Sequence, residues 1–216
     1  MCTTTWPRAT PGGILVFDLP NLPQQGGHHV RVFNNRIFDN DTKNFAPEGN
    51  IVGYVPTGSG LMIMANREVR VFENEFSGNG TAHLIIRGFL PYGDREMKDP
   101  NYYPYPQNIY IHSNSYGPGG DKPMGVRGEL YAKAAKAGGT LPDIVWDGIC
   151  DAERIKSGAL PANHRIFIDE EDASYVFLDL PSFMKDPDSS KVRRDISAHK
   201  GSLPDFDGVE LPQDDS

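Results

Sequence analysis

One sequence pattern occurs three times in this chain, and it constrains the fold more than any other feature. The copies span residues 28–41, 67–80 and 107–120, so they lie 39 and 40 residues apart. Each places two apolar residues two positions apart, then an asparagine, then another apolar residue, an alternation typical of strands with one buried face. The equivalent positions are Val30, Val69 and Ile109; Val32, Val71 and Ile111; Asn35, Asn74 and Asn114; and Ile37, Phe76 and Tyr116.

A second set of short apolar segments falls between these copies and aligns without gaps. The segments are residues 14–18, 61–65 and 83–87, which read ILVFD, LMIMA and HLIIR. From Leu61 to His83 is 22 residues, enough for one strand, a turn, a second strand and a second turn. Repeats of this size cannot bury their own apolar faces and gain a core by stacking on their neighbours. The sequence therefore predicts an all-β fold, a parallel β-helix with rungs of about 22 residues.

Long insertions interrupt this repeat, and the pattern ends near residue 120. The insertions form loops at residues 19–27, 41–57 and 90–106, and the second of these contains a short apolar piece at 51–55. Beyond residue 120 we expect one short helix within residues 124–137, strands near residues 143–149, 165–168 and 175–180, and a polar tail from residue 187 that lies loosely on the surface. The expected domains are 12–120, the β-helix rungs, and 121–216, a C-terminal cap and extended tail.

Charge and composition exclude several kinds of partner. The chain carries 21 Lys and Arg against 29 Asp and Glu, a net charge of -8, which argues against nucleic acid as the main partner. No apolar run approaches the ~20 residues of a spanning helix, so membrane insertion is not expected. The two cysteines, Cys2 and Cys150, form no metal motif or disulfide framework. The first twelve residues lack the features of a secretory signal and lead almost directly into a strand, so we expect an N-terminally shortened chain that can associate end to end.

With the repeats in place, the sequence resembles bacterial right-handed parallel β-helix proteins of the pectin-lyase-like superfamily, in the group known as parallel β-helix domain-containing proteins. The resemblance lies in residues 12–60, in NGTAHLII at 79–86 and in LPDIVWDGI at 141–149. It implies a right-handed coil and a periplasmic or extracellular location. Its motifs describe structure and not chemistry. The function that it implies is a binding or scaffold surface of the envelope or of a secreted protein, with polysaccharide as the expected ligand.

The alternative is a polysaccharide lyase or epimerase acting on uronate-containing polymers, so the sequence leaves open whether the chain is an enzyme. Its catalytic candidates are Asp18, His83 and Arg87, which the alignment of strands brings to one outward face. Only this alternative calls for a cofactor, Ca²⁺. We expect the same face to be covered by loops, because it also carries Ile14, Val16, Leu61, Ile63 and Ile85.

Three further groups of side chains have competing interpretations. Four tyrosines of the third loop, Tyr92, Tyr102, Tyr103 and Tyr105, either form a platform on which sugars stack or pack the loop onto the strands. Asn35, Asn74 and Asn114 are expected to stack as a structural ladder of amides. His28 and His29 could bind a metal with Asp18, but adjacent side chains of an extended chain point in opposite directions, so no metal site is predicted.

Overall fold

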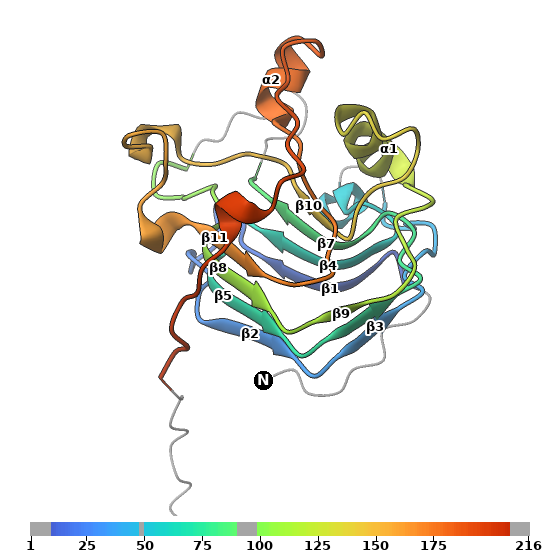
Figure 1. Ribbon diagram of the computed structural model, residues 1–216, viewed down its shortest axis with the longest axis horizontal. Helices are drawn as coiled ribbons and strands as arrows, with labels where there is room; N and C mark the ends of the chain where they lie inside the picture. The colour runs from blue at the N-terminus through green and yellow to red at the C-terminus, as the bar shows by residue number, and fades with distance from the viewer. Residues whose placement is uncertain (1–9, 48–49, 90–98, 208–216) are drawn as a thin grey trace, which may run out of the picture.

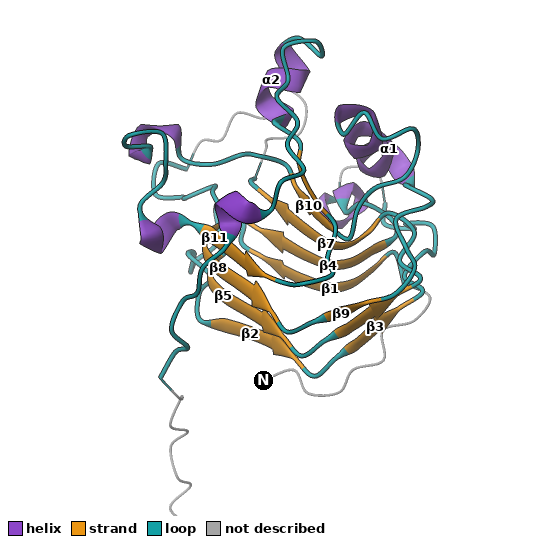
Figure 2. Cartoon of the chain, in the orientation of Figure 1, coloured by secondary structure: helices purple, strands orange, loops and turns teal. Residues whose placement is uncertain are grey.

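The computed structural model describes residues 10–47, 50–89 and 99–207, and most of its regular structure is β-strand (Figures 1 and 2). The strands are β1 (Gly12–Phe17), β2 (Val30–Phe33), β3 (Arg36–Phe38), β4 (Ser59–Met64), β5 (Arg67–Phe72), β6 (Glu75–Ser77), β7 (Ala82–Arg87), β8 (Gln107–His112), β9 (Ser115–Tyr116), β10 (Ile144–Trp146), β11 (Ile166–Asp169) and β12 (Tyr175–Phe177). The α-helices are α1 (Gly125–Ala134) and α2 (Leu180–Lys185), and the short 3-10 helices are η1 (Ile51–Tyr54), η2 (Ala152–Arg154), η3 (Ala162–His164) and η4 (Ser197–His199). None of the helices among the described residues is long and apolar enough to cross a bilayer.

The strands form three sheets in which every pairing is parallel. Their strand orders are β1-β4-β7-β10-β12, β11-β8-β5-β2 and β3-β6-β9. Along the chain, β1 to β3, β4 to β6 and β7 to β9 each contribute one strand to every sheet, so equivalent segments of successive copies lie side by side (Figure 1). Parallel strands cannot be joined by tight hairpins, and the inserted loops provide the longer connections.

The predicted single right-handed parallel β-helix is wrong as a description of this architecture. The strands form three separate parallel sheets, and no closed or solenoid sheet is found in the described residues. The extended strand conformation stops between β2 and β3, between β5 and β6, and between β8 and β9. The residues at these points have positive φ: 55° for Asn34, 54° for Glu73 and 55° for Ser113. Such left-handed residues end regular strand geometry, so the repeat predicts pairing between copies but not how the sheets join.

The predicted parallel register between the three copies is confirmed. Val32 pairs with Val71, and Val71 pairs with Ile111. In the second set of strands the predicted alignment is confirmed for β1 and β4, where Ile14 pairs with Leu61. It is wrong by one residue for β7, because Leu61 pairs with Leu84 and not with His83. A shift of one residue reverses the face on which every side chain of a strand lies.

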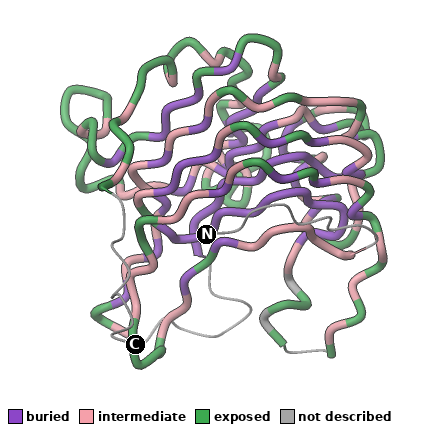
Figure 3. The backbone as a smooth tube through the Cα atoms, turned by 90° about the horizontal axis from the view of Figure 1, so that it is seen from below, coloured by how far each residue is buried: buried purple, intermediate pink, exposed green. Residues whose placement is uncertain are grey.

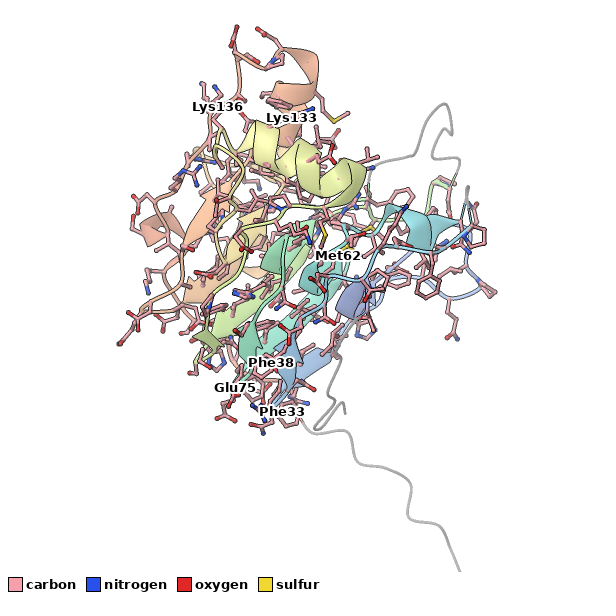
Figure 4. All side chains as sticks on the ribbon, turned by 90° about the vertical axis from the view of Figure 1, so that its right-hand side faces the viewer. Phe33, Phe38, Met62, Glu75, Lys133 and Lys136 are labelled. Carbon is pink, nitrogen blue, oxygen red and sulfur yellow. The ribbon has the colours of Figure 1, made fainter. Side chains whose placement is uncertain are left out.

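The core lies between the sheets, and the buried backbone runs through the centre of the molecule (Figure 3). Val16, Leu61 and Ile63 belong to this inner cluster, which corrects the prediction that they face outward. The alternate residues of β4 and β7, Met62 and Ile85, face a second buried cluster. Helix α1 covers that face, with Met62 beneath it in Figure 4. Burial of each large apolar side chain contributes about 1.5–3 kcal/mol, so both clusters matter for stability.

The C-terminal half is more closely integrated than expected. Strands β10, β11 and β12 extend the two larger sheets, and the region contains two α-helices where one was predicted. The tail is also attached, because Arg193 and Phe177 exchange two backbone hydrogen bonds and Arg31 forms an ion pair with Asp205 at 2.9 Å. The apolar piece of the second loop forms the 3-10 helix η1, Ile51–Tyr54.

Candidate functional site

The three catalytic candidates do not form an open site. Asp18, His83 and Arg87 are 5%, 0% and 1% exposed. The structure pairs Arg87 with Met64 of β4, so the predicted column of Asp18 and Arg87 does not exist. Their burial leaves no groove at which a polymer could reach them, and this removes the structural basis for a uronate lyase at these residues.

His83 is held as a neutral ring by two hydrogen bonds. The side-chain amide of Asn79 donates to Nδ1 at 3.0 Å, and Nε2 donates to the carbonyl of Gly117 at 2.9 Å. Burial lowers the pKa of His83, and the Gly117 carbonyl and Asp143 only partly oppose this. Because Asn40 donates in turn to Asn79, His83 ends a buried row of side chains and has no free nitrogen to act as a base.

Asp18 shapes the loop that follows it. Its carboxylate accepts a hydrogen bond from the backbone N–H of Gly26 at 2.7 Å, and its carbonyl accepts one from the hydroxyl of Tyr102 at 2.8 Å. It is not part of the ligand cluster that contains His28 and His29, which includes Glu68 instead.

Asn35, Asn74 and Asn114 form a hydrogen-bonded row across three strands. Asn35 Nδ2 donates to Asn74 Oδ1, and Asn74 Nδ2 donates to Asn114 Oδ1, both at 2.9 Å. Asn114 Nδ2 then donates to the buried carboxylate of Glu170 at 2.7 Å. Each asparagine also binds nearby backbone groups, so the row satisfies polar atoms at the corner between sheets and offers nothing to a ligand.

The tyrosines of the third loop divide into two groups. Tyr102 is 6% exposed and packs edge-on against Phe89, so it anchors the loop. Tyr92 lies outside the described residues. Tyr103 and Tyr105 are half-buried, with ring centroids 5.3 Å apart and ring planes at 79°.

A patch of polar side chains surrounds this second pair. The Tyr103 hydroxyl donates to Asp151 at 3.0 Å, and Arg154 Nε donates to the same carboxylate oxygen at 2.8 Å. The Arg154 guanidinium also lies 5.8 Å from the centre of the Tyr103 ring. We call Tyr103, Tyr105, Asp151 and Arg154 the tyrosine patch. It joins the loop before β8, green in Figure 1, to η2 in the gold segment at the left.

The protonation states within the tyrosine patch follow from these contacts. Burial raises the pKa of Tyr103 well above its ordinary value, and the neighbouring Asp151 adds to this, so its hydroxyl keeps its proton. Burial alone would raise the pKa of Asp151, but hydrogen bonds from Tyr103 and Arg154 outweigh it and lower the pKa. At neutral pH the patch therefore presents a phenol, a carboxylate and an exposed guanidinium in fixed positions.

A separate cleft of about 860 Å³ lies between the second loop and α1. Lys43, Lys122 and Arg127 contribute positive charge, and Met124, Leu130 and Met184 contribute apolar surface. None of the catalytic, metal-ligating or sugar-stacking candidates from the sequence lines this cleft, so it provides a comparison surface for experiments on the tyrosine patch.

The sequence identified Tyr103 and Tyr105 but not their partners. Asp151 and Arg154 follow a short strand 48 residues later in the chain, and no local motif links them to the tyrosines. No family model matches the chain, and no curated protein or solved structure is significantly similar to it.

Proposed function

We propose that this protein is a carbohydrate-binding protein and that its ligand docks on the tyrosine patch. The observation that carries the proposal is the perpendicular pair Tyr103 and Tyr105 beside a carboxylate and a guanidinium that hold each other in place. Tyrosine rings provide flat apolar area at small entropic cost, and their hydroxyls provide polar contacts. Sugars need both, because their C–H faces are apolar and their edges carry hydroxyl groups.

Preorganisation supports this role. Asp151 accepts hydrogen bonds from both Tyr103 and Arg154, so the polar groups are positioned before a ligand arrives. Fixed side chains lose less conformational entropy on binding, which favours affinity. The side chain of Arg154 is 51% exposed, so its guanidinium can contact a sugar hydroxyl or the carboxylate of a uronate.

The proposed role is binding without turnover, at the cell envelope or outside the cell as the resemblance to secreted proteins suggests. The burial of Asp18, His83 and Arg87 removes the residues that the alternative enzyme would use. No observation among the described residues favours a lyase or an epimerase elsewhere.

Replacing Tyr105 with alanine is expected to weaken glycan binding by about 5- to 30-fold, because truncation of an aromatic anchor commonly costs more than 1 kcal/mol. Arg154→Ala should weaken binding to polygalacturonate and alginate more than binding to a neutral glucan. Affinity electrophoresis in gels containing each polymer, followed by calorimetry with oligosaccharides, measures both effects.

Two variants serve as controls. Tyr110→Ala removes a half-buried tyrosine of β8 that stacks on His112, and Lys122→Ala removes a cation of the separate cleft. Both should bind like the unmodified protein. Binding that survives Tyr105→Ala and Arg154→Ala, or that is lost in Lys122→Ala, would place the ligand elsewhere, and unsaturated products from a uronate polymer would establish catalysis.

A further inference from the structure

Three side chains with metal-ligating atoms converge where β2 and β5 begin. His28, His29 and Glu68 each offer one ligand atom, and these atoms all lie within 4.8 Å of one another. His29 Nδ1 is 2.9 Å from Glu68 Oε2, and His28 Nδ1 is 3.7 Å from the same oxygen. The two Nδ1 atoms are also in direct contact.

The backbone explains how adjacent histidines come to share one side of the chain. Val30 pairs with Val69, so the residues before them lie side by side: His29 directly precedes β2, and Glu68 lies near the start of β5. Both have left-handed backbones, with φ of 56° and 55°. An extended chain would send His28 and His29 in opposite directions, but the left-handed residue turns the second ring toward the first. Their ring centroids are 4.6 Å apart.

The chemistry of the three atoms suits a transition-metal ion. Two imidazole nitrogens and a carboxylate oxygen match the ligands that zinc takes in three-ligand sites, which leave the fourth position to water. Tetrahedral coordination with bonds of 2.0–2.1 Å separates ligand atoms by about 3.3 Å, and the distances from Glu68 Oε2 to the two Nδ1 atoms, 2.9 and 3.7 Å, lie on either side of this value. The two Nδ1 atoms are closer together than this, so the rings must move apart to bind one ion. Magnesium and calcium prefer sites made only of oxygen atoms.

The surroundings hold the site in place without closing it. The side chains of His28, His29 and Glu68 are 49%, 51% and 32% exposed, so an ion and its water can enter. The ring of Phe206 packs against His29 with centroids 4.8 Å apart. The nearby cation Arg31 is already paired with Asp205, which reduces its repulsion of an incoming ion.

We propose that His28, His29 and Glu68 bind a divalent transition-metal ion, with Zn²⁺ as the expected metal. Each imidazole binds the ion through Nδ1 and keeps its proton on Nε2, and Glu68 binds through its carboxylate.

Zinc titration of the full, untagged chain tests the proposal. Calorimetry and competition with a chromophoric chelator should show one Zn²⁺ per chain, and Co²⁺ should give the visible absorption of a tetrahedral site. Glu68→Gln and His29→Asn should each weaken binding at least about tenfold. Asparagine is chosen at position 29 because it tolerates a left-handed backbone.

Matched controls separate this site from general effects. Glu73→Gln alters another glutamate next to β5 with a left-handed backbone, φ 54°, and His112→Asn alters a histidine of β8. Both should bind zinc normally, and all four variants should show the circular dichroism of the unmodified protein. Absence of zinc binding, or equal binding by Glu68→Gln and His29→Asn in their folded state, would overturn the proposal.

Discussion

Replacing Asn74 with alanine is expected to lower the free energy of unfolding by about 3–5 kcal/mol. Asn74 is 1% exposed, and its side-chain oxygen accepts hydrogen bonds from the backbone N–H and the side-chain amide of Asn35. Its amide donates to the carbonyls of Val32 and Phe72 and to Asn114, each at 2.9 Å. Alanine would leave these buried groups unsatisfied, and each orphaned group costs about 1–3 kcal/mol.

Urea denaturation followed by circular dichroism measures this loss. Asn163→Ala is the matched control, because Asn163 is exposed on the surface in η3 and its replacement should change stability by less than about 0.5 kcal/mol. If Asn74→Ala unfolds within 1 kcal/mol of the unmodified protein, water has replaced the amide and the row contributes little to the fold. Asn35 and Asn114 occupy neighbouring places in the row, so double variants with Asn74 should be non-additive.

This row is also the clearest case in which sequence alone located a structural feature. The three copies share two apolar positions and one asparagine, and these specify both which strands pair and which residues stand opposite each other. One face of β5 and β8 is buried while the other is only partly covered, so the alternation of apolar residues is visible. Register is strongly specified under those conditions.

Strands β4 and β7 show where such reasoning fails. Every residue of both strands is buried, because the inner cluster covers one face and α1 with its neighbouring loops covers the other. Strands buried on both faces read as continuous apolar runs without alternation. The sequence therefore does not specify the register of β7 on β4, and the predicted column of Asp18 and Arg87 is displaced by one residue.

The candidate sites were predicted only in part, because their residues come from segments distant in sequence. Tyr103 meets Asp151 across 48 residues, and His29 meets Glu68 through a strand pairing. Once the register of β2 and β5 is known, the position of Glu68 beside His29 follows directly. The left-handed backbone conformation of His29 does not follow from that register, because non-glycine residues rarely adopt it and nothing in the local sequence specifies it.

Asp147 is a completely buried ionisable residue, and its titration is expected to make stability depend on pH. Its carboxylate accepts hydrogen bonds from the backbone N–H groups of Gly88 and Ile149, at 3.0 and 2.9 Å. Burial raises the pKa of Asp147 from 3.8 to about 7, although those two hydrogen bonds and the charges of Arg87 and Arg127 act in the opposite direction.

Asp147 is therefore expected to lower the free energy of unfolding progressively as the pH rises from about 4 to about 7. In this window the folded state keeps a proton that the unfolded chain has released, so raising the pH favours unfolding; below it both states are protonated, and above it the full cost is present. Asp147→Asn cannot titrate and should remove the slope. Between pH 4.5 and 8, its unfolding free energy should fall by about 2–4 kcal/mol less than that of the unmodified protein.

Urea unfolding of both proteins at several pH values isolates this contribution, because other groups titrate equally in both. Burial lowers the pKa values of His83 and His199, so these two residues make the protein more stable as the pH rises toward about 6.5. Both proteins contain them, so their contribution cancels when the two unfolding free energies are subtracted. Asp188→Asn, at an exposed aspartate, should follow the unmodified protein at every pH. Parallel profiles for the unmodified protein and Asp147→Asn would mean that Asp147 is ionised throughout, with the positive charge of Arg87 outweighing the cost of burial.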